Sequence, residues 1–291
     1  MRCKYVKFAG KLKVVGCCCK AMSKLTDQLI VRPDSKLKLA KIDPDSDGGI
    51  KGKQTAALQL QKNLDRLAVL QHLLYAENRR GLLIVLQGID AGGKDGTIRN
   101  VMTGLNPQGC RVVSFKVPSE LEKRHDYLWR VHKQVPGTGE MVIFNRSHYE
   151  DVLVVRVHKL ITKAVWERRY CEINDFERML NDNGVKILKF FLYISKDEQK
   201  KRFEERIHNP EKNWKFSLAD VEERKYWDDY MSAFEDALNH CTTEHAPWYV
   251  IPANKKWFRN LAVSEVIVET MEEMKMRLPK PTADLSKIKF E

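Results

Sequence analysis

A glycine-rich turn directly after a short apolar run is the feature that most constrains the fold of this chain. The run covers 82–86, all Leu, Ile or Val, and the turn reads Gly88-Ile-Asp-Ala-Gly-Gly-Lys94, a G-x-x-x-x-G-K spacing. A continuously apolar run of this length is typical of a parallel strand covered on both faces. The glycines let backbone N–H groups approach an anion, and Lys94 adds a positive charge where the next helix begins. The sequence therefore predicts a strand, a phosphate-binding loop and a helix.

Four further apolar runs follow the glycine turn, and helix-length segments separate them. Alternation of buried strands with helices is typical of a parallel sheet with both faces covered. Before the first strand, leucines recur at spacings of three and four from Leu60 to Leu74, which predicts a helix with one buried face. A last helix is expected to continue to Leu278 and to end at Pro279. The four further runs are 112–115, 141–144, 187–194 and 248–251.

The expected architecture is an α/β, three-layer P-loop kinase-like fold, in which helices flank a five-stranded parallel sheet. A segment at about 200–230 is rich in Lys, Arg and aromatic residues and indicates a helix, a connector and a second helix. We expect this segment to form a helical lid. One P-loop domain is expected over 53–279, between a basic leader and connector at 1–52, partly disordered, and a C-terminal tail at 280–291.

The excess of basic residues indicates an anionic partner. The chain has 51 Lys and Arg against 39 Asp and Glu, a formal net charge of +12 at pH 7, and such a surplus attracts polyanions. Nucleic acid, acidic lipid and polyphosphate all satisfy this condition. The seven cysteines are odd in number and show no CxxC pair, which favours a reducing, cytoplasmic location. The apolar stretch at 14–19 is too short to span a bilayer, and we expect no membrane partner.

Two carboxylates distinguish this turn from the usual phosphate loop. Asp90 lies inside it, and Asp95 follows the lysine, where P-loop enzymes commonly have Ser or Thr. Carboxylates in an anion site repel phosphate unless they hold a divalent cation, which reverses the local charge and prefers oxygen ligands. We therefore expect Asp90 to bind Mg²⁺, with Mn²⁺ as an alternative. Asp95 is a weaker candidate, because the dipole also stabilises an acidic residue in a first helical turn.

A second polar motif, NRSHYED at 145–151, begins where the third apolar run ends. The carboxyl ends of parallel strands line the edge of the sheet where ligands bind in open α/β folds. We therefore expect Arg146 to face the bound phosphate. An Asp at the end of this strand usually binds the metal in P-loop enzymes, and its replacement by Asn145 moves that role to Asp90. Either Glu150 or Asp151 is placed to contribute through water.

The lid candidate at 200–230 carries a row of cations. Three cations fall on roughly one helical face, and three polar or basic residues follow on the connector, so the row can follow a chain of phosphates. The first three are Lys201, Arg202 and Arg206, and the others are Asn209, Lys212 and Lys215. The alternative is a solvated helix in which neighbouring glutamates pair with these cations and each charge contributes little. We expect Trp214, Tyr226 and Trp227 to pack at the base of the lid rather than to stack on nucleobases.

Three separated motifs in this order resemble the polyphosphate kinase 2 family. They are the turn at 88–96, the motif FNRSHYED at 144–151 and the segment WYVIPAN at 248–254. The stretch LNPQGCRVVSFKVP at 105–118 resembles the same family, and by this resemblance Arg111 is a phosphate-binding position. Agreement of several separate motifs in the right order makes a chance match improbable.

The resemblance covers roughly 55–278 and implies the activity of the chain. It implies a phosphotransferase that moves the terminal phosphate of inorganic polyphosphate to AMP or ADP in a reversible reaction. Asn145 together with Glu150 and Asp151 resembles the class III branch, whose members act on both nucleoside mono- and diphosphates. Adenine nucleotides are the expected acceptors, with guanine nucleotides as an alternative. A homo-oligomer, dimer or tetramer, is also implied by the resemblance alone.

Charge neutralisation is the expected catalytic principle, because the acceptor oxygen is already ionised and the main difficulty is repulsion between two anions. By resemblance, the family's metal-binding aspartate, P-loop lysine, second-motif arginine and a lid arginine fall on the expected catalytic residues Asp90, Lys94, Arg146 and Arg206. Asp90 is the expected metal ligand. The expected substrate- and phosphate-binding residues are Gly88, Ala91, Gly92, Gly93, Asp95, Gly96, Arg111, Asn145, Glu150, Arg202 and Lys212.

Two other functions share some of these features. An ATP-dependent nucleoside monophosphate kinase would have the same strand and helix order and a lid, but Asp95 after the lysine argues against it. A nucleic-acid-binding protein would explain the basic surface, and its binding would fall steeply with salt. The two carboxylates of the turn are then unexplained. We therefore expect no requirement for nucleic acid.

Overall fold

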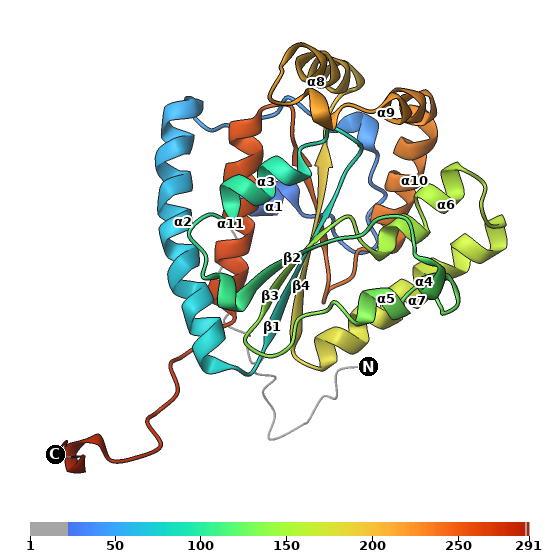
Figure 1. Ribbon diagram of the computed structural model, residues 1–291. Helices are drawn as coiled ribbons and strands as arrows, with labels where there is room; N and C mark the ends of the chain where they lie inside the picture. Colours follow the sequence, from blue (N-terminus) through green and yellow to red (C-terminus); the bar gives the residue numbers. More distant parts are fainter. Residues whose placement is uncertain (1–22, 289, 291) are drawn as a thin grey trace, which may run out of the picture.

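Five strands form one parallel sheet in the order β2-β3-β1-β4-β5, shown in Figure 1. The computed structural model describes residues 23–288 and 290, so the expectation of disorder for 1–22 lies outside the described residues. Each strand lies within two residues of its apolar run, which confirms the predicted sheet. The strands are β1 (Gly81–Gln87), β2 (Cys110–Ser114), β3 (Met141–Asn145), β4 (Val185–Tyr193) and β5 (Trp248–Pro252).

The central strand β1 separates two apolar cores. All seven of its residues are buried. Leu83 and Val85 belong to one core, whereas Leu82, Ile84 and Leu86 belong to the other. Successive side chains of a strand point to opposite faces of the sheet, so helices must cover both faces. This arrangement confirms the expected three-layer α/β fold.

Helices α2, α3 and α11 cover one face of the sheet, and α7 and α10 cover the other (Figure 1). Leu67 and Leu74 on α2 are buried, as the leucine spacing predicts. The covering helices are α2 (Gly52–Glu77), α3 (Lys94–Val101), α7 (Lys163–Asp182), α10 (Trp227–His240) and α11 (Lys256–Glu273). Three short helices, α4 (Glu120–Lys123), α5 (Trp129–His132) and α6 (Val154–Val157), flank β3 in the chain.

The expected lid is α8 (Lys196–His208), a connector and α9 (Leu218–Glu223), which lie above the carboxyl end of the sheet in Figure 1. The expectation for Trp214 is wrong, because its side chain is 74% exposed. Its indole Nε1 donates to the carbonyl oxygen of Glu211 at 3.0 Å, within the connector itself. The same expectation is confirmed for Trp227, which is 7% exposed and packs in the core at the base of the lid.

The last helix, α11, ends before the expected position. It stops at Glu273, and Lys275 has a φ of 51°, in the left-handed region that takes the chain out of a helix. Met276 then packs back into the core at 8% exposure, whereas Leu278 is 60% exposed. The apolar spacing therefore continues beyond the helix, which is why the sequence placed its end too late.

The segment before α2 packs along the outer side of the sheet. It begins with α1 (Lys24–Leu29), and Ile30 forms an isolated antiparallel bridge with Tyr249 of β5. Leu39 is 3% exposed, and its backbone N–H donates to Glu235 of α10 at 2.9 Å. The segment thus covers β5, the last strand of the sheet. Within the described residues, no helix combines the length and the apolarity needed to cross a membrane.

Candidate phosphate-binding site

The glycine turn connects β1 to α3 in the predicted order. Gly93 has a φ of 105° and directly precedes α3, and a Cβ on Gly88 would lie 3.0 Å from the carbonyl oxygen of Leu192. Ala91, with a φ of 60°, is the only residue of the turn with a side chain in the left-handed region. The lack of a side chain at Gly88 therefore lets the turn lie close to the backbone of β4 at Leu192. The unpaired N–H groups at the start of α3 then form an anion site.

The side chain of Lys94 points back into the glycine turn that precedes it in the sequence. Its side chain is buried, and Nζ donates to the carbonyl oxygens of Gly88 at 2.6 Å and Ile89 at 3.2 Å. Burial lowers the pKa of the Lys94 ammonium, and the positive charge of Arg146 lowers it further. A phosphate bound in the turn would offset both effects, so the ammonium is placed to bind an anion.

Arg146 connects the second motif to the turn, as predicted. Its Nη2 lies 2.6 Å from Asp90 Oδ1, and its Nη1 lies 3.4 Å from Glu150 Oε2. The backbone φ of Arg146 is 63°, a conformation that costs free energy in a residue with a side chain and that often occurs at functional sites. The structure therefore brings Asp90, Arg146 and Glu150 together beside Lys94.

Asp95 joins α3, the end of β3 and the lid connector. Asn145 Nδ2 donates to its Oδ1 at 2.9 Å, and Lys215 Nζ donates to its Oδ2 at 3.2 Å. Burial favours the neutral acid, but the hydrogen bonds from Asn145 and Lys215 outweigh it and lower the pKa of Asp95. The carboxylate is thus held charged, with a protein donor on each oxygen.

Arg202 connects the turn to the loop after β5 through hydrogen bonds to backbone carbonyl oxygens. It is 6% exposed, and its guanidinium donates to the carbonyl oxygens of Ala91 at 2.9 Å and Asn254 at 3.1 Å. Nε lies 2.7 Å from the carboxylate of Glu198. Because these partners occupy its donors, Arg202 fixes the turn and the loop after β5 rather than offering a free charge to phosphate.

The other two predicted lid cations are more accessible. Arg206 lies 3.3 Å from Asp220 Oδ2 of α9, and this pair joins the two lid helices. Lys212 is exposed on the connector. Neither cation pairs with the glutamates at 204 and 205, so the picture of a solvated helix with internal ion pairs does not describe them.

Arg111 does not lie with the other predicted residues. It pairs in register with Val142, which pairs with Leu83 near the start of β1, whereas the turn begins at Gly88. The separation along the strand is roughly 16 Å. The Arg111 guanidinium instead donates to the Oε1 and carbonyl oxygen of Gln134, both at 2.9 Å. Arg111 therefore does not make the expected phosphate contact, because it lies near the amino ends of the strands and the turn lies at their carboxyl ends.

A small cavity beside the turn contains residues that the sequence reasoning missed. Gln199 of α8 donates through Nε2 to the carbonyl oxygen of Asp90 at 3.0 Å, and Tyr230 donates to Glu223 at 2.8 Å. No motif signals these residues, because they come from separate elements that meet only in the fold. The lining is Gly88, Ile89, Asp90, Arg146, Glu150, Leu153, Val154, Gln199, Glu223, Tyr230 and Phe234.

The carboxylates near the turn fit a metal ion shared with a substrate. Within the described residues, no group of three or more His, Cys, Asp or Glu side chains converges to hold a metal. Mg²⁺ is commonly held by one or two carboxylates together with substrate phosphates and water. Asp90, whose Oδ1 pairs with Arg146, fits this donor set better than Asp95, whose two oxygens both have protein partners.

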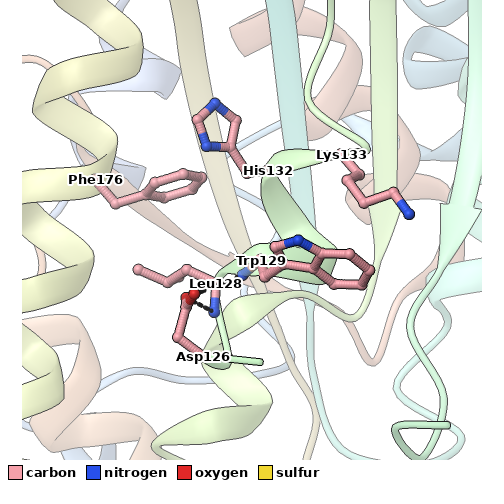
Figure 2. Close-up of a pocket in the computed structure, with 6 residues that line it drawn as sticks. All are labelled: Asp126, Leu128, Trp129, His132, Lys133 and Phe176. Atoms are coloured by element: carbon pink, nitrogen blue, oxygen red, sulfur yellow. Dashed lines mark hydrogen bonds between the residues drawn. The ribbon is translucent and has the colours of Figure 1, made fainter. Parts of the chain in front are cut away.

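A wider hollow of about 480 Å³ lies at α5 and α7, away from the turn (Figure 2). Trp129 and His132 line it from α5, and Phe176 from α7. The His125 ring stacks on the Trp129 ring at a centroid distance of 4.0 Å, and Lys133 Nζ lies 4.2 Å from the Trp129 ring centroid. None of the predicted site residues lines this hollow.

A parallel sheet with a P-loop, a buried lysine within it and a cationic lid above it defines a P-loop phosphotransferase. Comparison with known proteins makes the class specific. The sequence pattern of the polyphosphate kinase 2 family matches residues 51–279, and the chain belongs to that family.

Named relatives agree with this assignment. The chain is 56% identical to an AMP/ADP-polyphosphate phosphotransferase from Meiothermus ruber, over 90% of this chain and 98% of the relative. It is 48% identical to an ADP-polyphosphate phosphotransferase from Rhodopseudomonas palustris, over 88% of this chain and 93% of the relative. The crystal structure of a polyphosphate kinase 2 from Arthrobacter aurescens has a TM-score of 0.87 and 43% identity, and covers 90% of this chain and 94% of that one.

Proposed function

We propose that this protein transfers the terminal phosphate of inorganic polyphosphate to AMP and to ADP, and that the reaction is reversible. The proposal is supported by the activities for which the two relatives are named, each of which matches this chain over nearly its full length. The observation that carries it is the pair formed by Lys94 inside the turn and Arg146 beside it, since two cations with separate anchors can hold two phosphates.

The reaction requires two anions to approach each other. The attacking oxygen of AMP or ADP is ionised near neutral pH, so no strong general base is needed. Lys94 and the N–H groups of α3 bind the phosphate chain at the turn, and Arg146 faces the acceptor side of the same site. Arg206, which pairs with Asp220 of the lid at 3.3 Å, would add a further positive charge from the lid. These charges are fixed by the fold, so they stabilise charge in the transition state without reorganisation.

A divalent cation completes the charge balance in this proposal. Mg²⁺, with Mn²⁺ as an alternative, would be held by Asp90 and would neutralise charge on the phosphate oxygens. Glu150 lies 3.4 Å from Arg146, so it can orient the arginine and hold water. Asp90 Oδ1 and Arg146 Nη2 lie 2.6 Å apart, so each side chain limits the motion of the other.

The experiment is a donor-by-acceptor screen with the purified protein and Mg²⁺. We expect polyphosphate to convert AMP to ADP and ADP to ATP without any nucleoside triphosphate. The Asp90→Asn variant should lose most of both activities. An ATP-dependent nucleoside monophosphate kinase would instead phosphorylate AMP with ATP as sole donor and would ignore polyphosphate. Formation of ADP from AMP only in that second arm, with no ADP or ATP formed from polyphosphate, would refute the proposal.

The finer expectations belong to the same proposal. Action on both AMP and ADP is supported by the Meiothermus ruber relative, and guanine nucleotides are included in the acceptor screen. A cytoplasmic location is supported by Cys110, Cys171 and Cys241, which are free thiols within the described residues. We also propose a homo-oligomer, dimer or tetramer, to be measured as native mass by light scattering. Addition of DNA to the assay should not raise the rate, since nucleic acid is not part of the reaction.

A further inference from the structure

Arg259, in the first turn of α11, is a buried cation without an acidic partner. It is 3% exposed. Among the residues that the structure describes, its guanidinium donates only to Asn260 Oδ1, from Nε at 3.1 Å and from Nη2 at 2.7 Å. Burial, together with the smaller effect of the Arg202 charge, lowers the pKa of Arg259 to about 10. The guanidinium is therefore in an environment that opposes its own charge.

The guanidinium lies directly against the phosphate loop. A Cβ built on Gly93 would lie 2.1 Å from Arg259 Nη1 and 3.4 Å from Arg202 Nη1. A Cβ built on Gly96 would lie 3.2 Å from Arg259 Nη2. Any side chain at Gly93 would thus collide with Arg259. These glycines allow a guanidinium to approach the same backbone whose N–H groups face the anion site.

The charges around Arg259 do not balance in the protein alone. Arg202, its neighbour, has the carboxylate of Glu198 at 2.7 Å. Lys189, which is fully buried elsewhere in the fold, has Glu177 at 2.5 Å. A buried ion that lacks such a partner destabilises the folded state. Arg259 lacks one, and the nearest place at which an anion binds is the turn against which it lies.

We propose that Arg259 is an electrostatic component of the donor site, and that its charge is balanced by the phosphate chain held in the turn. This inference rests on the proposed function only in naming that anion as polyphosphate. Arg259 acts through the glycine backbone and need not touch the substrate. In the absence of ligand its charge costs stability, and with phosphate bound the same charge strengthens binding, because interactions at short range in a buried site are weakly screened.

The test measures stability and anion binding in the same variants. Arg259→Met removes the charge and keeps much of the volume, Arg259→Gln is a second neutral variant, and Arg259→Lys retains the charge. The matched control is Arg80→Met, because Arg80 pairs with Glu77 at 2.6 Å far from the turn. Melting temperature without ligand, the dissociation constant for tripolyphosphate from calorimetry, and KM and kcat for polyphosphate are measured for each.

We expect the neutral Arg259 variants to melt at the wild-type temperature or above it, and to bind tripolyphosphate about tenfold more weakly. KM for polyphosphate should rise by a similar factor with a smaller change in kcat, and Arg259→Lys should stay within about threefold of wild type. Arg80→Met should melt lower and bind tripolyphosphate normally, since it breaks a compensated pair.

A lower melting temperature with unchanged tripolyphosphate binding in Arg259→Met would overturn the inference, because Arg259 would then be only a brace. Loss of the folded state in both neutral variants would overturn it as well. The binding arm separates this inference from the proposed function. If the wild-type protein does not use polyphosphate but Arg259→Met still weakens tripolyphosphate binding, the function is wrong and the role of Arg259 stands. If the wild-type protein uses polyphosphate but Arg259→Met binds tripolyphosphate normally, the proposed function stands and the role of Arg259 is wrong.

Discussion

At the scale of single residues, the site depends on charges that have been taken out of water. Lys94 is buried against carbonyl oxygens, and Arg146 is held between Asp90 and Glu150. The buried charge of Lys94 is costly in the empty protein and acts strongly on an incoming ion. Burial also opposes the charge of Arg146, but Glu150 and Asp90 outweigh it, so they raise the pKa of Arg146 and stabilise its charge. Substitutions at these positions should therefore separate function from stability.

Replacing Lys94 by Ala should reduce kcat for ATP formation from polyphosphate by about 100-fold or more, since a fixed charge on the transferring group is removed. The folded state should not suffer, because burial already opposes the ammonium and lowers its pKa. The measurement is the initial rate of ATP formation together with the melting temperature. Retention of wild-type activity, or a large drop in melting temperature, would contradict this assignment.

A buried cluster of charged and polar side chains around Glu177 stabilises the second motif. Glu177 of α7 accepts a hydrogen bond from Tyr149 at 2.9 Å, pairs with His148 at 3.1 Å and lies 2.5 Å from Lys189. All of these side chains are fully buried. The group therefore fixes the two residues that directly follow Arg146 and Ser147 in the motif.

Glu177→Gln should lower the free energy of unfolding by about 3 kcal/mol, because Lys189 would be left as a buried charge without a partner. Burial alone would raise the pKa of Glu177, but Lys189 and His148 outweigh it, so this pKa lies below its ordinary value of 4.5. The contribution of Glu177 is thus complete above that value and is lost as the pH falls through the lower, folded-state pKa. The difference between variant and wild type should shrink in that acidic range.

Denaturant unfolding as a function of pH measures this effect. Glu167→Gln, on the same helix and in an exposed pair with Lys163 at 3.5 Å, is the matched control and should change stability by less than about 1 kcal/mol. Equal effects of the two substitutions at neutral pH would show that burial of the pair at Glu177 has no energetic consequence.

The residue scale also shows how far the sequence could predict the site. The backbone spacing placed Asp90, Lys94 and Arg146 correctly near one another, because the end of a parallel strand fixes where its next residue lies. Arg111 was misplaced, since it begins its strand rather than ending it. The environment of Arg259 could not be predicted, because its neighbours come from α3 and α8 and meet it only in the folded chain.

At the scale of elements, continuous apolar runs located every strand to within two residues, because buried parallel strands need apolar side chains on both faces. Helix ends were less predictable. The spacing of apolar residues continues through Met276 although α11 has already ended, since the chain after the helix packs on the same core. The contact between the lid connector and α3, through Lys215 and Asp95, had no sequence signal at all.

Lys215→Ala should raise KM for polyphosphate about threefold while leaving the melting temperature unchanged. The physical reason is that Lys215 joins the lid connector to Asp95 at 3.2 Å, and the side chains are partly exposed. Loss of this contact makes the closed lid less favourable without affecting the core. Lys225→Ala is the matched control, because Lys225 pairs with Glu222 of the lid and with no other acidic residue in the described part of the chain. An equal KM in both variants would exclude a role of the contact in closure.

At the scale of the whole molecule, net charge is unevenly distributed along the chain. Residues 1–22 contain six Lys and Arg and no Asp or Glu, which is half of the formal net charge of +12. A surplus of this kind raises the local concentration of a polyanion and speeds its capture, and salt screens the effect. Long polyphosphate should benefit more than a short chain, because it carries more charges within reach of the protein.

Replacing all six basic residues of 1–22 by Gln in the full-length protein should raise KM for long-chain polyphosphate several-fold at about 50 mM salt. The same variant should match wild type at about 500 mM salt, where the screening length falls to a few ångström. Neither kcat nor KM for ADP should change, because the residues of the turn and of the second motif are untouched. The substituted residues are Arg2, Lys4, Lys7, Lys11, Lys13 and Lys20. A difference that persists at high salt would mean that the segment makes specific contacts, and no difference at low salt would mean that charge near the site alone captures the donor.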